Sequence, residues 1–225
     1  MRQDVIEFRR ILLRWHPSNY RDYPWRQTDN PYHILIAELM LRRTRADQVV
    51  PVYEEFIKRY PTPLDLDNSE DNDVAEIVYS LGLEWRVPAF KNVVRELGEQ
   101  YDYQVPDSRD KLIELSGVGE YVAGAILSLA YEKREWIVDT NVARVFKRYF
   151  GLDTIKETRR DKQVIEIAKV YANTDQVRDA NLAILDFAAI VCKARNPECR
   201  NCQANSICVY FSGSRNGVDR VSSNR

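Results

Sequence analysis

The sequence lacks a long apolar run, an excess of charge of either sign, and any cysteine before position 192. No apolar stretch approaches the roughly 18 residues that a membrane-spanning helix needs, so we expect no membrane partner. The N-terminus, MRQDVIEFRR, has no apolar core of the kind found in signal peptides. These absences favour a soluble intracellular protein.

Glycine is scarce, and strand patterns are missing. The 225 residues include eight glycines and show no runs in which apolar and polar residues alternate. Many segments instead have apolar residues at the helical period of about 3.6 residues. With 44% hydrophobic residues, the chain can bury a sizeable core in one large domain or two small ones. The predicted fold class is all-α.

The formal net charge of −1 does not by itself suggest nucleic acid as a partner. Charge is local, however, and we expect one basic face and one acidic face. The acidic run extends from Asp65 to Glu76, and the basic groups are Arg42/Arg43/Arg45, Arg144/Lys147/Arg148 and Lys193/Arg195/Arg200.

The most informative stretch, residues 112–144, reads LIELSGVGEYVAGAILSLAYEKREWIVDTNVAR. Gly117 and Gly119 allow a tight hairpin and the close approach of a bulky ligand. A helix follows, so the hairpin amides lie at a helix N-terminus, where free N–H groups and the dipole favour an anion such as a DNA phosphate. An ordinary helix-turn-helix corner with a glycine cap is the alternative.

Asp139 follows Gly119 by 20 residues and directly precedes Thr140-Asn141-Val142. A helix N-cap is the expected place for such an aspartate, and capping could be its whole role. The hairpin, the helix and this aspartate together resemble the helix-hairpin-helix DNA glycosylases, the superfamily of endonuclease III and the MutY-type adenine glycosylases. That resemblance implies that Asp139 is the catalytic carboxylate and that Asn141 lies near the same centre.

Glu38 interrupts the apolar helix that we expect after Asn30-Pro31. The carboxylate either pairs with Arg42 one turn later or lies in a partly dry pocket, where desolvation raises the pKa of a carboxyl group and suits it to general acid work. In MutY-type enzymes, the glutamate at the matching position protonates the departing adenine and handles the water. The resemblance therefore makes Glu38 a catalytic candidate.

Arg42-Arg43-Thr44 resembles the Arg-Arg-Thr of the thermophilic mismatch thymine/uracil glycosylases, and differs from the Gln-Gln-Thr of the adenine enzymes. The resemblance implies that Arg43 fills the gap left by the extruded nucleotide, and its donors match the acceptor edge of guanine. Two solvated arginines at a helix end are the alternative. The resemblance also places a wedge on Leu83, with ordinary core packing as the alternative. It supports a base-pocket contact for Arg26, with a buried tryptophan and a surface arginine as the alternative.

Tyr121 occupies the motif position at which the strand-cutting glycosylases carry a lysine. A neutral amine can attack C1′ and form a Schiff base, whereas tyrosine cannot. We therefore predict hydrolysis without lyase activity. Tyr121 is expected to pack near Asp139 and hold that residue or the sugar, with plain core packing as the alternative.

The four cysteines are Cys192, Cys199, Cys202 and Cys208. A cluster this compact in an intracellular chain favours a metal site over disulfides, and zinc is the generic occupant. The spacing resembles that of the [4Fe-4S] cluster of endonuclease III and MutY-type enzymes. One such cluster is expected to be structural, folding a loop whose Lys193 and Arg195 meet DNA phosphates.

The resemblance covers about residues 20 to 210 and implies two helical lobes with a DNA-binding cleft between them. We expect a six-helix module at 25–136, an iron-sulfur module formed by 1–24 and 137–211, and a polar, disordered tail at 212–225. The implied protein is a monomer of the prokaryotic cytoplasm, associated with the nucleoid, that acts on double-stranded DNA with a mismatched or damaged base.

The predicted activity is monofunctional hydrolysis of the N-glycosidic bond of thymine or uracil opposite guanine. Arg42-Arg43, Leu83 and the end of the chain soon after Cys208 favour this substrate. The alternatives are an adenine glycosylase acting on A:G or A:8-oxoguanine, and a non-catalytic protein that binds DNA lesions with Asp139 acting only as a cap.

Overall fold

The computed structural model describes residues 1–213, in which the helices are α or 3-10 and no strand forms. The predicted all-α class is confirmed. Two compact units divide the chain: unit 1 contains Met1–Arg21 and the segment from Arg134 onward, and unit 2 is Asp22–Lys133. Unit 2 begins and ends three residues before the module expected at 25–136.

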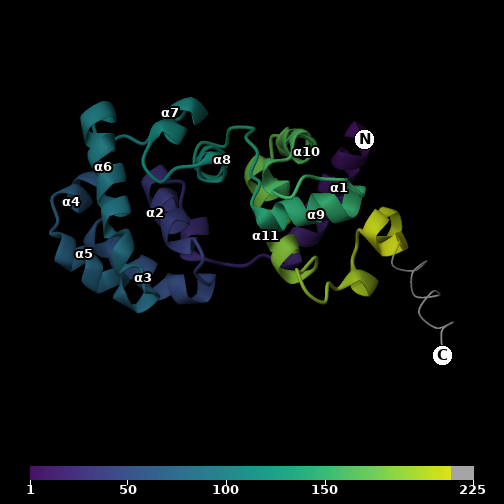
Figure 1. Ribbon diagram of the computed structural model, residues 1–225, viewed down its shortest axis with the longest axis horizontal. Helices are drawn as coiled ribbons and strands as arrows, with labels where there is room; N and C mark the ends of the chain where they lie inside the picture. The colour runs from purple at the N-terminus through teal and green to yellow at the C-terminus, as the bar shows by residue number, and fades with distance from the viewer. Residues whose placement is uncertain (214–225) are drawn as a thin grey trace. The chain divides into compact units, whose positions relative to one another are not determined.

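Unit 2 is a bundle of helices around α2 (Figure 1). The apolar helix α2 is buried over most of its length and packs against α3 and α8, while α6 covers α4 and α5. The start of α2 is well specified because the Asn30 side chain accepts hydrogen bonds from the amides of Tyr32 and His33, at 2.9 and 3.4 Å. The α-helices of unit 2 are α2 Pro31–Leu41, α3 Ala46–Arg59, α4 Pro63–Asp67, α5 Asp71–Val78, α6 Val87–Tyr101, α7 Arg109–Glu114 and α8 Glu120–Leu129.

The short helix α4 adds a seventh α-helix to the six expected in this module. Thr62 and Asp65 form a capping box, in which the Thr62 hydroxyl accepts from the Asp65 amide at 3.2 Å and the Asp65 carboxylate accepts from the Thr62 amide at 3.1 Å. Pro63 supplies the first helical residue. These local signals start a helix that apolar periodicity over so few residues does not reveal.

Lys91 is a buried cation that holds the end of α4. Its side chain is 5% exposed, and its ammonium donates to the carbonyl oxygens of Leu66, Asp67 and Ser69 at 2.8, 2.8 and 2.7 Å. One side chain therefore satisfies three backbone acceptors, of which the Leu66 carbonyl also accepts from the Ser69 amide at 3.2 Å and the Ser69 hydroxyl at 2.6 Å.

Replacing Lys91 by methionine keeps an unbranched side chain that is one atom shorter, but removes all three hydrogen bonds. We expect Lys91→Met to lower the free energy of unfolding by about 3 kcal/mol, because buried acceptors without partners are costly. Urea denaturation followed by circular dichroism measures the change. Lys58→Met, at an exposed position of α3, is the matched control and should change stability by less than about 0.5 kcal/mol. Equal effects of the two substitutions would contradict this account.

Unit 1 is built from α1 Arg2–Trp15, α9 Thr140–Phe150, α10 Lys162–Ala172 and α11 Val177–Ile190. Its core is aromatic around Phe8, whose ring stacks on Tyr149 at 4.0 Å and meets the edge of Phe187 at 6.0 Å. After α11 the chain continues as the cysteine segment, residues 191–208, with short 3-10 turns at Cys199–Asn201 and Asn205–Ile207. This segment packs against the same core, because Cys192, Cys202 and Cys208 contact it.

A fully buried carboxylate ties the chain that leaves α1 to α11. Asp186 has 0% exposure and accepts from His16 Nε2 at 3.0 Å, from Arg21 Nε at 2.5 Å and from the Arg21 amide at 3.2 Å. Several donors on one carboxylate satisfy the requirement for burying a charge. The segment before unit 2 is thereby fixed to unit 1.

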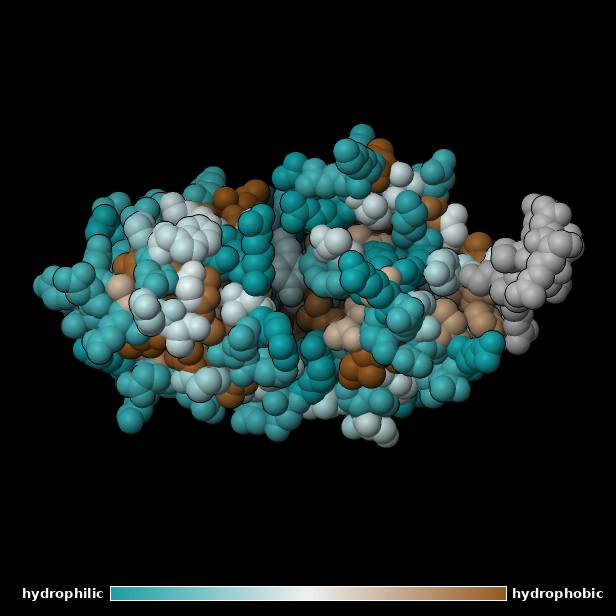
Figure 2. Space-filling model, turned by 60° about the horizontal axis from the view of Figure 1, so that its bottom comes forward, coloured by the Kyte–Doolittle hydropathy of each residue, from teal (hydrophilic) through white to brown (hydrophobic). Residues whose placement is uncertain are grey.

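On the face in Figure 2, hydrophilic residues predominate over each unit and hydrophobic residues form small patches. No helix in residues 1–213 is long and apolar enough to cross a membrane.

Residues 209–213 are helical, and the Ser212 amide donates to the Cys208 carbonyl at 3.1 Å. The expectation of a disordered tail was therefore wrong for Ser212 and Gly213. The rest of that tail, 214–225, lies outside the described residues.

Candidate functional site

The glycine hairpin joins α7 to α8 in unit 2. Gly117 has φ of +78°, a left-handed conformation that side chains rarely adopt, and the Val118 amide closes the turn on the Leu115 carbonyl at 3.0 Å. A Cβ built on Gly119 would meet nothing within 4 Å. The first amide bonded inside α8 is that of Ala123, to Gly119 O at 2.9 Å. The earlier amides therefore lie at an open helix N-terminus, where a phosphate oxygen can approach the backbone.

Arg42 connects the end of α2 to this hairpin, because its guanidinium donates to the carbonyl of Gly117. The atoms packed around it exclude water and lower the pKa of Arg42, while the negative charge of Glu38 acts in the opposite direction. Arg42 belongs to the basic group Arg42/Arg43/Arg45 and is also a predicted DNA contact. The structure gives Arg42 a further role, which is to hold the hairpin in place.

Glu38 lies inside α2 with 8% exposure and interacts electrostatically with Arg42. Both environments expected from the sequence, a neighbouring arginine and a mostly dry surrounding, therefore apply to the same carboxyl group. Its role in catalysis stays a prediction.

Arg43 is exposed and has φ of +59°, in the left-handed region. Such a backbone in a residue other than glycine costs on the order of 1–2 kcal/mol and often marks a functional position. Burial lowers the pKa of Arg86, and the positive charges of Arg42 and Arg43 lower it further. These three guanidinium groups, called here the arginine cluster, lie close enough to act on one another.

Leu83 is buried, as its core-packing alternative anticipated, whereas Arg26 is buried where its alternative expected a surface arginine. Arg26 is 7% exposed, with its guanidinium 5.4 Å from the centre of the Tyr23 ring, and Tyr23 stacks on Trp25 at 4.9 Å. Leu83 is 3% exposed. Inserting it into DNA would require the side chain to leave the interior of unit 2, at a cost of about 2 kcal/mol. The base-pocket and wedge roles stay predictions.

Asp139 is the N-cap of α9 in unit 1. Its Oδ1 accepts from the amides of Asn141 and Val142 at 2.9 and 2.7 Å, and its Oδ2 accepts from Asn141 Nδ2 at 2.7 Å. The capping expected from the sequence is therefore observed. The carboxylate is partly exposed, so an oriented negative group remains available to a ligand. Tyr121 is half-buried in the first turn of α8 in unit 2, and its predicted proximity to Asp139 stays a prediction.

Arg144 links the Asp139 cap to the cysteine segment. Its Nη1 donates to Asn141 Oδ1 at 2.7 Å, and its Nε donates to the Cys192 carbonyl at 3.0 Å. Asn141 in turn donates to Asp139. Cap and cysteine segment thus share one chain of hydrogen bonds.

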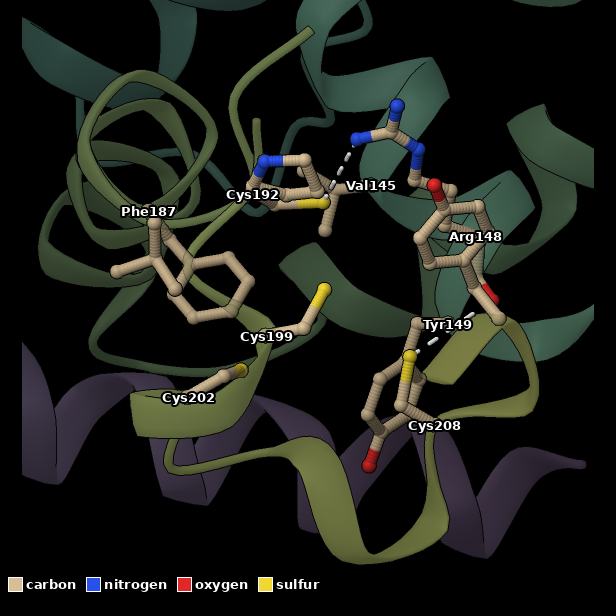
Figure 3. Close-up of a pocket in the computed structure, with 11 residues that line it drawn as sticks. Val145, Arg148, Tyr149, Phe187, Cys192, Cys199, Cys202 and Cys208 are labelled. Carbon is tan, nitrogen blue, oxygen red and sulfur yellow. Dashed lines mark hydrogen bonds between the residues drawn. The ribbon is translucent and has the colours of Figure 1, made fainter. Parts of the chain in front are cut away.

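The four cysteines line one pocket in unit 1 (Figure 3). Its other walls are mainly apolar and come from α9, α11 and the cysteine segment, namely Val145, Tyr149, Phe187, Val191 and Pro197, with Arg148 and Tyr210. Arg148 Nη1 lies 3.7 Å from Cys192 Sγ. Burial raises the pKa of Cys202 to about 11 and also raises the pKa of Cys199 and Cys208. Metal binding would therefore have to displace thiol protons.

The cysteine segment is held by a second arginine of α9. Arg148 donates to the carbonyls of Lys193 and Ala194 at 2.7 and 3.1 Å. Lys193 pairs with Glu198 at 2.6 Å, and Arg195 is exposed. Lys193 and Arg195 stay predicted phosphate contacts.

Arg144 and Arg148 were assigned from sequence only to a basic group. The structure directs both toward backbone carbonyls of the cysteine segment and the end of α11. The sequence does indicate that the two arginines point in one direction, because they are four residues apart and share one face of α9. What the spacing did not identify was the acceptor.

A hairpin of this form, placed before a buried helix in an all-helical chain, defines a helix-hairpin-helix protein. Residues 36–172 match the HhH-GPD superfamily of base excision DNA repair proteins, and the chain belongs to this superfamily.

Individual relatives agree with this assignment. The chain is 35% identical over 214 residues to a thymine/uracil-DNA glycosylase of Pyrobaculum aerophilum, covering 92% of this chain and 93% of the relative. It is 36% identical over 213 residues to a thymine-DNA glycosylase of Aeropyrum pernix, covering 92% and 96%. The solved structure of a thermostable thymine-DNA glycosylase superposes with a TM-score of 0.87 at 32% identity, covering 94% of this chain and 98% of that one.

Proposed function

We propose that this protein is a DNA glycosylase that releases thymine or uracil mispaired with guanine, by hydrolysis and without cutting the strand. Similarity to thymine and thymine/uracil glycosylases over more than nine-tenths of the chain supports the substrate class. The structural observation on which the proposal depends is the Asp139 carboxylate, held at the start of α9 by the amides of Asn141 and Val142.

The chemistry follows from a fixed negative charge. As the N-glycosidic bond lengthens, the sugar becomes oxocarbenium-like, and the Asp139 carboxylate stabilises the positive charge at C1′. Water then adds to C1′ and completes the hydrolysis. Because its oxygens are already oriented by the helix start and by Asn141, little reorganisation is needed as the charge develops. Glu38 assists departure of the base or positions the water.

Thymine and uracil can leave as stabilised anions, whereas adenine must first be protonated. Glu38 alone would favour adenine, so the adenine glycosylase remains the alternative. Arg43 favours a guanine partner, because a guanidinium donates two hydrogen bonds to guanine O6 and N7. Its exposure and left-handed backbone support a role outside the core.

The cysteine pocket supports a [4Fe-4S] cluster as the resident group. Among the described residues, no three His, Cys, Asp or Glu side chains are arranged to hold a single metal ion. A four-iron cluster binds one thiolate per iron, so its sulfur ligands stand apart around the cluster, as four cysteines around one pocket can. The apolar walls and the Arg148 donor suit a buried group with negative ligands. When bound, the cluster would supply cross-links that hold the loop of Lys193 and Arg195.

Labelled duplexes with T:G, U:G, A:G and A:8-oxoguanine, incubated with the protein and then treated with hot alkali, test the activity. We expect alkali-labile sites at T:G and U:G, no strand breaks before alkali, and no adduct trapped by borohydride. The absence of an amine at Tyr121 is the physical reason for the last two expectations.

A matched T:A duplex is the control for specificity. Cleavage confined to A:G and A:8-oxoguanine would favour the adenine alternative, and no labile site in any duplex would favour a non-catalytic lesion binder. Borohydride-trapped adducts would contradict hydrolysis as the only activity.

A further inference from the structure

Glu120 places a negative charge at the glycine hairpin, where the free amides can receive a DNA phosphate. It is the first residue of α8, directly after Gly119, and its side chain is 58% exposed. A carboxylate at a helix N-terminus is attracted by the same amides and dipole as a phosphate, and it repels the phosphate. Without a partner, Glu120 would therefore oppose DNA binding at this hairpin. The proposed function does not account for this residue.

Arg109 holds this carboxylate. It is the first residue of α7, and its Nη1 donates to Glu120 Oε2 at 2.8 Å and to the Glu120 carbonyl at 2.9 Å. Since α7 packs against α8 (Figure 1), the contact joins the starts of the two helices that flank the hairpin. The Arg109 side chain is 16% exposed. Because the guanidinium is mostly buried and makes both contacts, it determines where the carboxylate lies.

Other charged side chains contact the hairpin before its free amides. The Glu96 carboxylate accepts from the Ser116 amide at 2.6 Å and from the Ser116 hydroxyl, and Arg42 donates to the Gly117 carbonyl. The free amides follow at the start of α8, where Glu120 is the acidic residue. Within residues 1–213, its carboxylate bonds Arg109 and makes no hydrogen bond to an amide of the hairpin.

An ion pair with one partner this exposed contributes little to folding stability. Its position gives it a larger effect on binding, because DNA brings a dense row of negative charges to the hairpin. We propose that Arg109 is a positioning residue for DNA binding. It neutralises Glu120 and holds the carboxylate off the free amides, so that a phosphate can occupy them.

This inference rests on the proposed function insofar as it requires a DNA ligand, but it does not require base release. The test is therefore binding of a T:G duplex, and of a duplex with a tetrahydrofuran abasic analogue that no glycosylase can process. We expect Arg109→Met to weaken binding of both duplexes by about tenfold, because a carboxylate without its partner then faces the phosphate. Glu120→Gln removes that charge and should bind about threefold more tightly than the unchanged protein. Fluorescence anisotropy of labelled duplexes measures the affinities.

The double variant Arg109→Met/Glu120→Gln separates neutralisation from structural support. Methionine removes the bond to the Glu120 carbonyl in both variants that carry it, whereas only the double variant also lacks the carboxylate. We expect the double variant to bind within about threefold of the unchanged protein. Binding as weak as that of Arg109→Met would overturn the inference, because Arg109 would then act by holding the backbone or by contacting the phosphate itself. Weaker binding by Glu120→Gln alone would also overturn it, and that variant keeps Arg109.

Salt supplies an independent readout that a structural role would not change. Ions screen the repulsion between Glu120 and a phosphate. The difference in affinity between Arg109→Met and the double variant should therefore shrink as the salt concentration rises from about 50 to about 300 mM. A difference that does not depend on salt would contradict the electrostatic origin.

Arg59→Met is the matched control. It breaks another arginine–carboxylate pair of unit 2, in which Arg59 of α3 lies 3.4 Å from Asp73 of α5. We expect it to bind both duplexes within about twofold of the unchanged protein; a loss equal to that of Arg109→Met would overturn the inference, as would failure of the unchanged protein to bind either duplex. Failure of the proposed function is distinguishable, because the binding pattern would remain while no base is released from the T:G duplex.

Discussion

Asp139→Asn is expected to reduce the single-turnover rate of base release from a T:G duplex by about a thousandfold, since fixed charges that stabilise a transition state contribute on this scale. Asparagine keeps an oxygen that can accept from the Asn141 and Val142 amides, which now bond Oδ1. The helix start is therefore retained while the negative charge is lost. Duplex binding should change little, because the charge acts on the sugar cation and not on the phosphates.

Asp139→Ala separates capping from catalysis. It should lose the same activity and in addition lower the free energy of unfolding by about 1 kcal/mol, because asparagine caps a helix and alanine does not. Thermal melting of both variants, beside single-turnover kinetics, distinguishes the two effects. Base release by Asp139→Asn at the unchanged rate would refute the proposed mechanism.

Replacing two of the proposed cluster ligands should produce the largest loss of stability. We expect the double variant Cys199→Ser/Cys202→Ser to lose its bound iron and more than about 4 kcal/mol of stability in unit 1, as is typical when a structural metal group is removed. Without the thiolate bonds, the cysteine segment keeps its packing against the core of unit 1 and the hydrogen bonds from Arg144 and Arg148 to its carbonyls.

Elemental analysis and visible charge-transfer absorption measure the loss of iron, and urea denaturation measures the loss of stability. The unchanged protein should contain about four iron atoms per chain. Ser206→Ala, an exposed position in the same segment, should retain the iron and change stability by less than about 0.5 kcal/mol. Zinc in place of iron in protein purified without oxygen would contradict the cluster assignment.

Much of the fold and part of the site followed from local patterns. Apolar periodicity predicted the longer helices, the pattern around Gly117 predicted the hairpin, and the position of Asp139 predicted an N-cap. These features depend on residues close together in sequence, so their physical causes are visible there. The short helix α4 was missed because a five-residue helix has no apolar period.

The less predictable features depend on residues far apart in the chain. Lys91 and the carbonyls that it contacts are more than 20 residues apart, and Arg144 and the Cys192 carbonyl are 48 residues apart. No spacing rule identifies such partners. The Leu83–Trp85 turn illustrates the same difficulty, since sequence gives both as apolar residues after a glycine and only packing decides which one is exposed.

By itself, the sequence determined the helical class, the membership of a DNA-repair superfamily and the residues from which a site could be made. The tertiary structure decided how these residues are used: it oriented the Asp139 carboxylate, gathered the four cysteines around one pocket, and exposed Trp85 instead of Leu83. The physical reason is that periodicity, capping and turn chemistry act over a few residues. Burial and the pairing of distant polar groups exist only once the helices have packed.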